Sequence, residues 1–220
     1  MRSVFPSIEA GDPVSLGAAA ARQIPVADAE SSAAVALEWI CTRQTISPKR
    51  LVEPGPTAQE LDAILRCAAA APDHGLLRPW RFVIVPAQRR AGLGEVFAAA
   101  LIDRDPGATL EQIEAAREKA QRAPLLMLVV AQLGAAEPPI PVLERMVSVG
   151  AAVQNMLLAA HAMGYGASLT SGQAMTSPRL RALFDLTPGE EAVCFVNIGT
   201  VAKRKAARLH PAVESFVSVL

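Results

Sequence analysis

The sequence predicts one domain that contains both helices and strands, and three observations support this. The 220-residue chain is 51% hydrophobic, which suits a sizeable core within one domain. A Thr followed three residues later by Glu or Gln marks a helix start at Thr57 and again at Thr109. A continuous apolar run of strand length at residues 125–131 predicts a strand covered on both faces, and residues 192–198 predict a second buried strand.

Composition excludes several classes of protein. The chain carries 21 basic and 21 acidic residues, so it has no net positive charge that would attract nucleic acid or an anionic membrane. The three cysteines and three histidines are spread far apart, which argues against a disulfide framework and against a metal site. The N-terminus lacks the apolar region of a signal peptide, and residues 125–131 are too few to span a bilayer. We therefore expect a soluble, cytoplasmic protein.

The first part of the chain predicts an arm followed by the start of the domain. Residues 1–34 mix Pro, Gly, Ser and Ala without a period, which indicates a variable N-terminal arm, and residues 35–220 form the domain. Apolar spacing from Val35 predicts a helix that ends near Thr42. Residues 58–70 form an amphipathic helix after the Thr57 cap, and the β-branched residues 81–85 form a strand.

The remaining elements follow from the same signals. An Ala-rich helix spans residues 89–101, and a charged helix begins after Thr109 and ends before Pro124. The longest helical pattern spans residues 142–163, where Gly150 costs on the order of 1 kcal/mol relative to Ala, so close packing against another helix is its expected role. The turn around Gly164 leads into an extended segment at 167–170, and Ser177 caps a helix that continues to Phe184.

Polar clusters occur where these elements end, at residues 43–50, 73–78, 169–172 and 203–208. Loops beside packed elements are common ligand sites, and the two basic clusters suit a phosphate, because Arg donates two parallel hydrogen bonds. The glycines Gly164 and Gly166 do not complete a dinucleotide-binding motif, and there is no nucleophile elbow or Walker sequence. These clusters weakly indicate a phosphorylated cofactor.

Four motifs give a more specific indication. They are Arg43-Gln44-Thr45-Ile46-Ser47-Pro48-Lys49; Pro72-Asp73-His74-Gly75 with Arg78-Pro79-Trp80-Arg81; Gly164-Tyr165-Gly166-Ala167 with Ser171-Gly172; and Asn197-Ile198-Gly199-Thr200. In this order they resemble the small FMN-dependent nitroreductase family, and within it the compact NAD(P)H nitroreductases, over residues 35–207. The resemblance implies an α+β fold with a central, mainly antiparallel sheet flanked by helices. It also implies an intertwined homodimer with FMN at the subunit interface.

The resemblance also implies which residues contact the flavin. Arg43, Gln44 and Thr45 match the segment that binds the phosphate and the ribityl chain. His74 and Arg78 match positions that reach the flavin across the interface. Leu169, Thr170 and Ser171 match the segment beside the isoalloxazine ring, and Arg204, with Lys203 as the alternative, matches a late phosphate contact. No catalytic side chain and no metal ligand are implied, because the flavin supplies the chemistry.

The chain departs from the family at two of these segments. Gln44 and Thr45 stand where the family has Arg and Ser, and Leu169-Thr170 stands where it has Trp-Arg. Each lost charge-assisted hydrogen bond is worth roughly 1.5 to 3 kcal/mol, so FMN affinity is expected to fall unless Lys49 or Lys203 substitutes.

Simpler roles exist for the same residues. Arg43 would stabilise the end of the preceding helix, His74 would be an ordinary turn residue, and Arg78 would brace the turn before Trp80. Trp80 itself is expected in the core or at a dimer contact, and residues 203–208 would be a solvated basic tail.

Two functions are consistent with these residues. The first is an oxidoreductase in which NAD(P)H reduces FMN, and FMN then reduces a nitroaromatic, quinone or similar acceptor by a ping-pong mechanism. The alternative is a dimeric module, with or without flavin, that has a regulatory or structural role. The expected partners are a second copy of the chain and a small-molecule acceptor.

Overall fold

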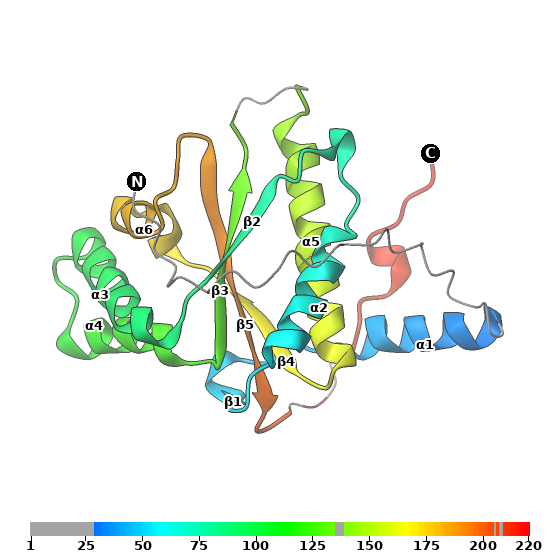
Figure 1. Cartoon of the computed structure of the whole chain (residues 1–220), viewed down its shortest axis with the longest axis horizontal. Helices are drawn as coiled ribbons and strands as arrows, with labels where there is room; N and C mark the ends of the chain where they lie inside the picture. Colours follow the sequence, from blue (N-terminus) through cyan, green and yellow to red (C-terminus); the bar gives the residue numbers. More distant parts are fainter. Residues whose placement is uncertain (1–28, 135–138, 205, 207–208) are drawn as a thin grey trace, which may run out of the picture. The chain divides into compact units, whose positions relative to one another are not determined.

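The computed structural model describes residues 29–134, 139–204, 206 and 209–220 (Figure 1). Residues 1–28 of the expected N-terminal arm, and Lys205 and Arg208 of the expected basic tail, lie outside the described residues. The chain divides by its contacts into Met1–Ala36 and Leu37–Leu220. The central sheet and the helices that pack on it belong to the second of these units.

A five-stranded antiparallel sheet forms the centre of the domain. The strand order is β1-β5-β3-β2, and β4 also pairs with β5. The strands are β1 (Leu51–Val52), β2 (Trp80–Ile84), β3 (Leu125–Gln132), β4 (Gly166–Thr170) and β5 (Glu190–Val201). Every pairing between these strands is antiparallel, which confirms the α+β class and the antiparallel sheet.

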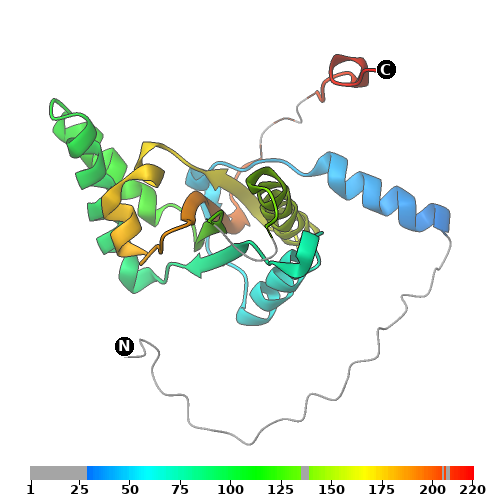
Figure 2. The same ribbon diagram turned by 90° about the horizontal axis from the view of Figure 1, so that it is seen from above.

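Strand β3 is covered on both faces, as its apolar run predicted. Leu126, Leu128 and Val130 join one core cluster, whereas Met127, Val129 and Ala131 join the other. Successive side chains of a strand point to opposite faces, so this alternation places a helical layer on each side of the sheet. Figures 1 and 2 show these two layers on either side of β3 and β5.

Helices α2 (Ala58–Ala69) and α5 (Val142–Ala162) cover one face. Ile64 of α2 and Met156 of α5 are fully buried in the same cluster as Met127. The expected capping box of α2 is present: the Thr57 hydroxyl accepts from the Glu60 amide at 3.3 Å, and the Glu60 carboxylate accepts from the Thr57 amide at 2.8 Å. The hydrogen bonds donated by Thr57 lower the pKa of Glu60.

Helices α3 (Ala87–Arg104), α4 (Leu110–Arg117) and α6 (Pro178–Leu183) cover the other face. Leu93 of α3 and Leu180 of α6 are fully buried against this side of the sheet, together with Phe195 of β5. Arg90 is buried because its guanidinium donates to the carbonyls of Val85, Ala123 and Pro124.

The structure adds short elements that the sequence did not predict. Helix α1 (Ala29–Thr42) ends where expected but begins inside the segment interpreted as an arm. The basic loop after it contains the 3-10 turn η1 (Pro48–Arg50) and the two-residue strand β1. Such elements are too short to show a hydrophobic period, so tertiary contacts define them. The other 3-10 turns are η2 (His74–Leu76), η3 (Glu118–Gln121), η4 (Gln173–Thr176) and η5 (Val213–Ser215).

No described helix is both long enough and apolar enough to cross a membrane.

Candidate functional site

The segment Arg43-Gln44-Thr45 lies beside strand β4, which carries another of the expected flavin segments. Thr45 forms an isolated parallel bridge with Ala167, and the Ile46 amide donates to the Ala167 carbonyl at 3.0 Å. Ile46 is buried against Leu51, which anchors the segment after α1 ends. Tertiary folding therefore brings residues 43–45 and 167–171 together, although more than a hundred residues separate them in the sequence.

Two of the expected phosphate contacts act on one histidine. The pKa of His161, in the last turn of α5, is lowered first by burial and then by the positive charges of Arg204 and Arg43. The Thr42 hydroxyl donates to the Glu38 carbonyl at 2.7 Å, so the 3.1 Å contact between Thr42 Oγ1 and His161 Nε2 requires the imidazole to donate. Within the described part of the chain, neither Arg43 nor Arg204 forms an ion pair.

Buried polar atoms without partners lie in the same two segments. Gln44 Oε1 and Ser168 Oγ are buried and have no hydrogen-bond partner among the described residues. A buried polar atom that lacks a partner costs roughly 1 to 3 kcal/mol. Both segments therefore contain a polar atom whose hydrogen-bonding capacity is unmet among the described residues.

The segment Leu169-Thr170-Ser171 ends β4 and enters the wall of a cavity. Leu169 is 44% exposed although its backbone pairs with Val196. Thr170 Oγ1 accepts a hydrogen bond from Asn197 Nδ2 at 3.0 Å, and Asn197 is only 2% exposed. Asn197 therefore holds the end of the strand in place.

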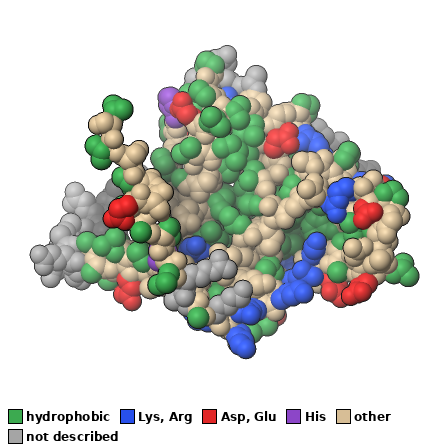
Figure 3. All heavy atoms as spheres, turned by 180° about the vertical axis from the view of Figure 1, so that it is seen from behind, with side chains coloured by type: hydrophobic (Ala, Val, Ile, Leu, Met, Phe, Trp, Pro, Cys, Tyr) green, Lys and Arg blue, Asp and Glu red, His purple; other side chains and the backbone are tan. Residues whose placement is uncertain are grey.

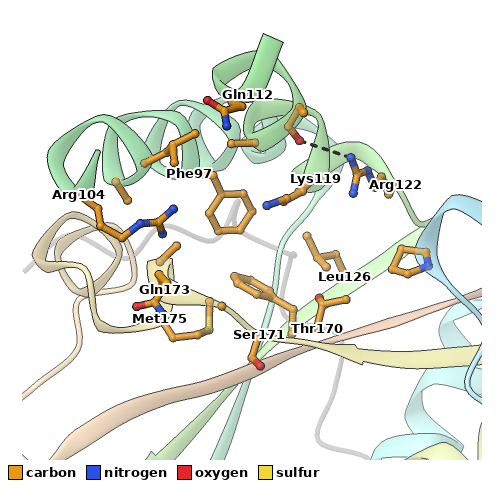
Figure 4. A pocket seen from close by; sticks show the side chains of 18 of the residues that line it. Phe97, Arg104, Gln112, Lys119, Arg122, Leu126, Thr170, Ser171, Gln173 and Met175 are labelled. Carbon is orange, nitrogen blue, oxygen red and sulfur yellow. Dashed lines mark hydrogen bonds between the residues drawn. The ribbon is translucent and has the colours of Figure 1, made fainter. Parts of the chain in front are cut away.

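The cavity adjoining this segment has a volume of about 530 Å³. Its floor is apolar, and Thr170 and Ser171 lie on one side of it while α3, α4 and η3 form the other (Figure 4). This volume lies in the range of small-molecule sites. Arg43, Gln44, His74, Arg78 and Arg204 do not line it.

His74 and Arg78 lie far from the other expected contacts. The His74 imidazole donates from Nδ1 to Glu144 Oε2 at 2.7 Å, and Glu144 is in the first turn of α5. His161 is 17 residues further along that helix, which corresponds to about 25 Å. The Arg78 amide donates to Asp73 Oδ2 at 2.6 Å, within the same loop as His74. One chain therefore does not bring His74 and Arg78 to Arg43 and Arg204.

No cluster of three or more His, Cys, Asp or Glu side chains that could hold a metal ion occurs in the described part of the chain.

Comparison with known proteins places this arrangement in a family. The nitroreductase family model matches residues 42–200. A relative from Escherichia coli K12, named "Putative NAD(P)H nitroreductase YdjA", is 35% identical over 165 residues, which cover 75% of this chain and 87% of the relative. This chain belongs to the nitroreductase family. The membership confirms the family and the enzyme class, an oxidoreductase, that the motifs predicted.

Solved structures agree with the nitroreductase fold. A nitroreductase-like family protein from Bacillus cereus matches with a TM-score of 0.72 at 18% identity, covering 84% of this chain and 95% of that chain. A nitroreductase from Bacteroides fragilis, solved with bound FMN, matches with a TM-score of 0.63 at 21% identity, covering 84% and 97%. These matches confirm the nitroreductase-like fold.

Sequence reasoning missed two residues that shape this nitroreductase site. In the sequence His161 is one of three isolated histidines, but its place just before the helix-ending Gly164 puts it at an element end, where the other polar clusters also occur. Asn197 was seen only as part of a motif, yet a buried polar residue inside an apolar strand is itself a signal that it bonds to something specific.

Anion binding beside His161 should raise its pKa. The charges of Arg43 and Arg204 disfavour the imidazolium, so an anion that neutralises them restores protonation. We expect the NMR titration of the His161 ring to move to higher pH when inorganic phosphate is added. Because the folded pKa is below the ordinary value, the free energy of unfolding should fall as the pH decreases below about 6.5, and phosphate should reduce this loss.

The matched control is the double variant Arg43→Gln/Arg204→Gln. Its His161 should titrate at higher pH than in the parent without any phosphate, and added phosphate should change it little. An unchanged titration in both experiments would contradict the assignment of these two arginines to an anion site.

Proposed function

We propose that this nitroreductase is a cytoplasmic FMN-dependent oxidoreductase that uses NAD(P)H as reductant and follows a ping-pong mechanism. When bound, FMN would supply the redox chemistry that links NAD(P)H to a nitroaromatic, quinone or similar acceptor, and the residues of this chain would hold it in place. The observation that carries the proposal is the bridge from Thr45 to Ala167, which brings the segment of Arg43 next to the strand whose end lines the cavity. The charges of Arg43 and Arg204 both lower the pKa of His161, after burial, which supports it. The relative named an NAD(P)H nitroreductase and the neighbour solved with FMN support this choice of cofactor and reductant.

The residues of this chain fit the parts of FMN. Arg43 and Arg204 would bind the phosphate, while the His161 imidazole, whose pKa both cations lower after burial, donates its Nε2 proton to Thr42 Oγ1. Gln44 and Thr45 would contact the ribityl chain, whose hydroxyl groups satisfy the unpartnered Gln44 Oε1. Leu169, Thr170 and Ser171 would contact the ring and exclude water from it. No side chain in the site needs to act as a nucleophile or general base.

The proposal requires a homodimer. His74 contacts Glu144 in the first turn of α5, and His161 lies about 25 Å further along that helix, so His74 and Arg78 would act on the flavin held by the other subunit. The outer face of α5 offers the contact: Leu143 is 80% exposed, Val147 is 71% exposed, and a side chain at Gly150 would meet open space. Seen from behind, hydrophobic side chains gather on the face that carries α5 (Figure 3). This fits the expected close approach of another helix at Gly150.

Colour tests the proposal directly. The purified protein should be yellow, should release flavin when denatured, and should lose its flavin absorption when NADH or NADPH is added without oxygen. A colourless protein that fails to bind added FMN would rule the proposal out. Bound flavin that neither reductant bleaches would instead favour a regulatory or structural dimer.

A further inference from the structure

The cavity beside Thr170 and Ser171 combines an apolar floor with a cationic wall. Phe97 and Phe195 meet edge to face in the floor, with ring centroids 5.6 Å apart, and Leu126 and Met175 extend it. Arg104 enters at the end of α3, and Lys119 enters from η3. Figure 4 shows both side chains turned toward the ring of Phe97.

The charges of this wall are not neutralised. Within the described part of the chain, Arg104, Lys119 and Arg122 form no ion pair, and Arg122 makes only a 3.4 Å hydrogen bond to the Ala115 carbonyl. Among the described residues of the lining the one carboxylate, Asp105, accepts from the Gly107 amide at 3.1 Å. This lining thus carries three cationic side chains and one carboxylate.

Two arginines just outside the cavity form ion pairs with carboxylates, unlike the cations that line it. Arg117 of α4 is paired with Glu95 at 2.6 Å and also with Glu114, and Arg179 of α6 is paired with Asp103 at 2.6 Å. Arg117 and Arg179 are thus neutralised by carboxylates, whereas the three cations that line the cavity form no ion pair with a described residue. An unpaired cation at the edge of an apolar surface favours a ligand that brings an anion.

We propose that this cavity binds electron acceptors that carry an anionic group, a carboxylate, sulfonate or phosphate, on an aromatic or apolar body. The body would lie on Phe97, Leu126 and Phe195, and the anion would face Arg104 and Lys119. The assignment rests on the proposed function, because Thr170 and Ser171 belong both to this lining and to the expected flavin segment. It deepens that function by naming the charge of the acceptor.

The phosphate groups of the reductant offer the same chemistry as an anionic acceptor. NADPH carries one more phosphate than NADH, so a comparison of these two nucleotides separates the sources. If Arg104 and Lys119 serve the acceptor, their removal should affect an anionic acceptor without changing the ratio of NADPH to NADH affinity.

The test compares two ligands that differ in charge. Binding of 4-nitrobenzoate and 4-nitrobenzyl alcohol is measured by calorimetry on the purified protein and on the double variant Arg104→Gln/Lys119→Gln. We expect the variant to bind 4-nitrobenzoate about tenfold more weakly or worse, since two charge-assisted contacts are lost, and to bind the alcohol within about twofold of the parent. In steady-state assays kcat/KM for the two acceptors should follow the same pattern.

Two further variants sharpen the result. Arg89→Gln removes an exposed cation from the same helix α3 outside the cavity and should change neither ligand. Arg104→Lys keeps the charge and should retain most of the preference for 4-nitrobenzoate. Equal thermal unfolding of the double variant and Arg89→Gln, followed by circular dichroism, shows that both are folded.

The outcomes separate the two proposals. Unchanged 4-nitrobenzoate binding in the double variant would overturn the pocket assignment. A double variant in which only the ratio of NADPH to NADH affinity changed would overturn it as well. A different outcome is that the parent binds no FMN, while Arg104→Gln/Lys119→Gln still weakens 4-nitrobenzoate binding and Arg89→Gln does not. In that case the anion pocket would stand and the proposed redox function would be wrong.

Discussion

The double variant Arg43→Gln/Arg204→Gln should bind FMN at least about a hundredfold more weakly than the parent. The positive charges of both guanidinium groups lower the pKa of the same imidazole, after the effect of burial, and the proposal assigns both to a single phosphate. Each charge-assisted hydrogen bond contributes roughly 1.5 to 3 kcal/mol, and 1.4 kcal/mol corresponds to a factor of ten. The dissociation constant can be measured from the quenching of flavin fluorescence as protein is added.

Riboflavin provides the control for this experiment, because it lacks the phosphate. Its affinity should be nearly equal in the parent and in the variant, whereas the preference for FMN over riboflavin should collapse. If the variant lost affinity for both flavins equally, the arginines would be stabilising the fold, and the phosphate assignment would be wrong. Arg89→Gln should leave both affinities unchanged.

Val147→Glu should convert the proposed dimer into a monomer and remove FMN at the same time. The substitution places a carboxylate in the middle of the exposed apolar face of α5, and the twofold symmetry of a homodimer would bring in a second copy. Burying an unpaired charge costs several kcal/mol, so the dissociation constant should rise about a thousandfold or more. Sedimentation at micromolar concentration and the flavin content of the purified protein are the two measurements.

Leu110→Glu is the matched control for that variant. Leu110 is 86% exposed at the start of α4, away from α5, and a carboxylate there should leave both assembly and flavin content unchanged. A parent protein that is already a monomer would contradict the dimer itself. A Val147→Glu monomer that still binds FMN tightly would contradict the role of His74 and Arg78 across the interface.

Gln44 stands where the family has an arginine, and the structure bears on which residues would replace this missing positive charge. The amide oxygen of Gln44 is buried without a partner among the described residues, and an amide cannot neutralise a phosphate. Arg204, the basic contact that the sequence predicts, and Arg43 both lower the pKa of His161, after the larger effect of burial. The proposed phosphate site would therefore depend on residues 43 and 204 and would not need a second arginine at position 44.

Local sequence signals predicted most of the secondary structure of this protein. The Thr57 and Thr109 capping boxes, the Ser177 cap and the buried run of β3 all act through neighbours within a few residues or through a simple period, so their outcome can be read along the chain. The motifs likewise identified the family, because they preserve residue types in a characteristic order.

Tertiary structure decided which of these segments act together. The bridge from Thr45 to Ala167, the effect of the Arg43 and Arg204 charges on His161, and the contact of His74 with the opposite end of α5 depend on how distant segments pack on the sheet. The same holds for the cavity, where residues of α3, η3 and β4 meet only after folding. Side-chain types and local periods determine elements, whereas a binding site requires distances between elements, which only the packed core sets.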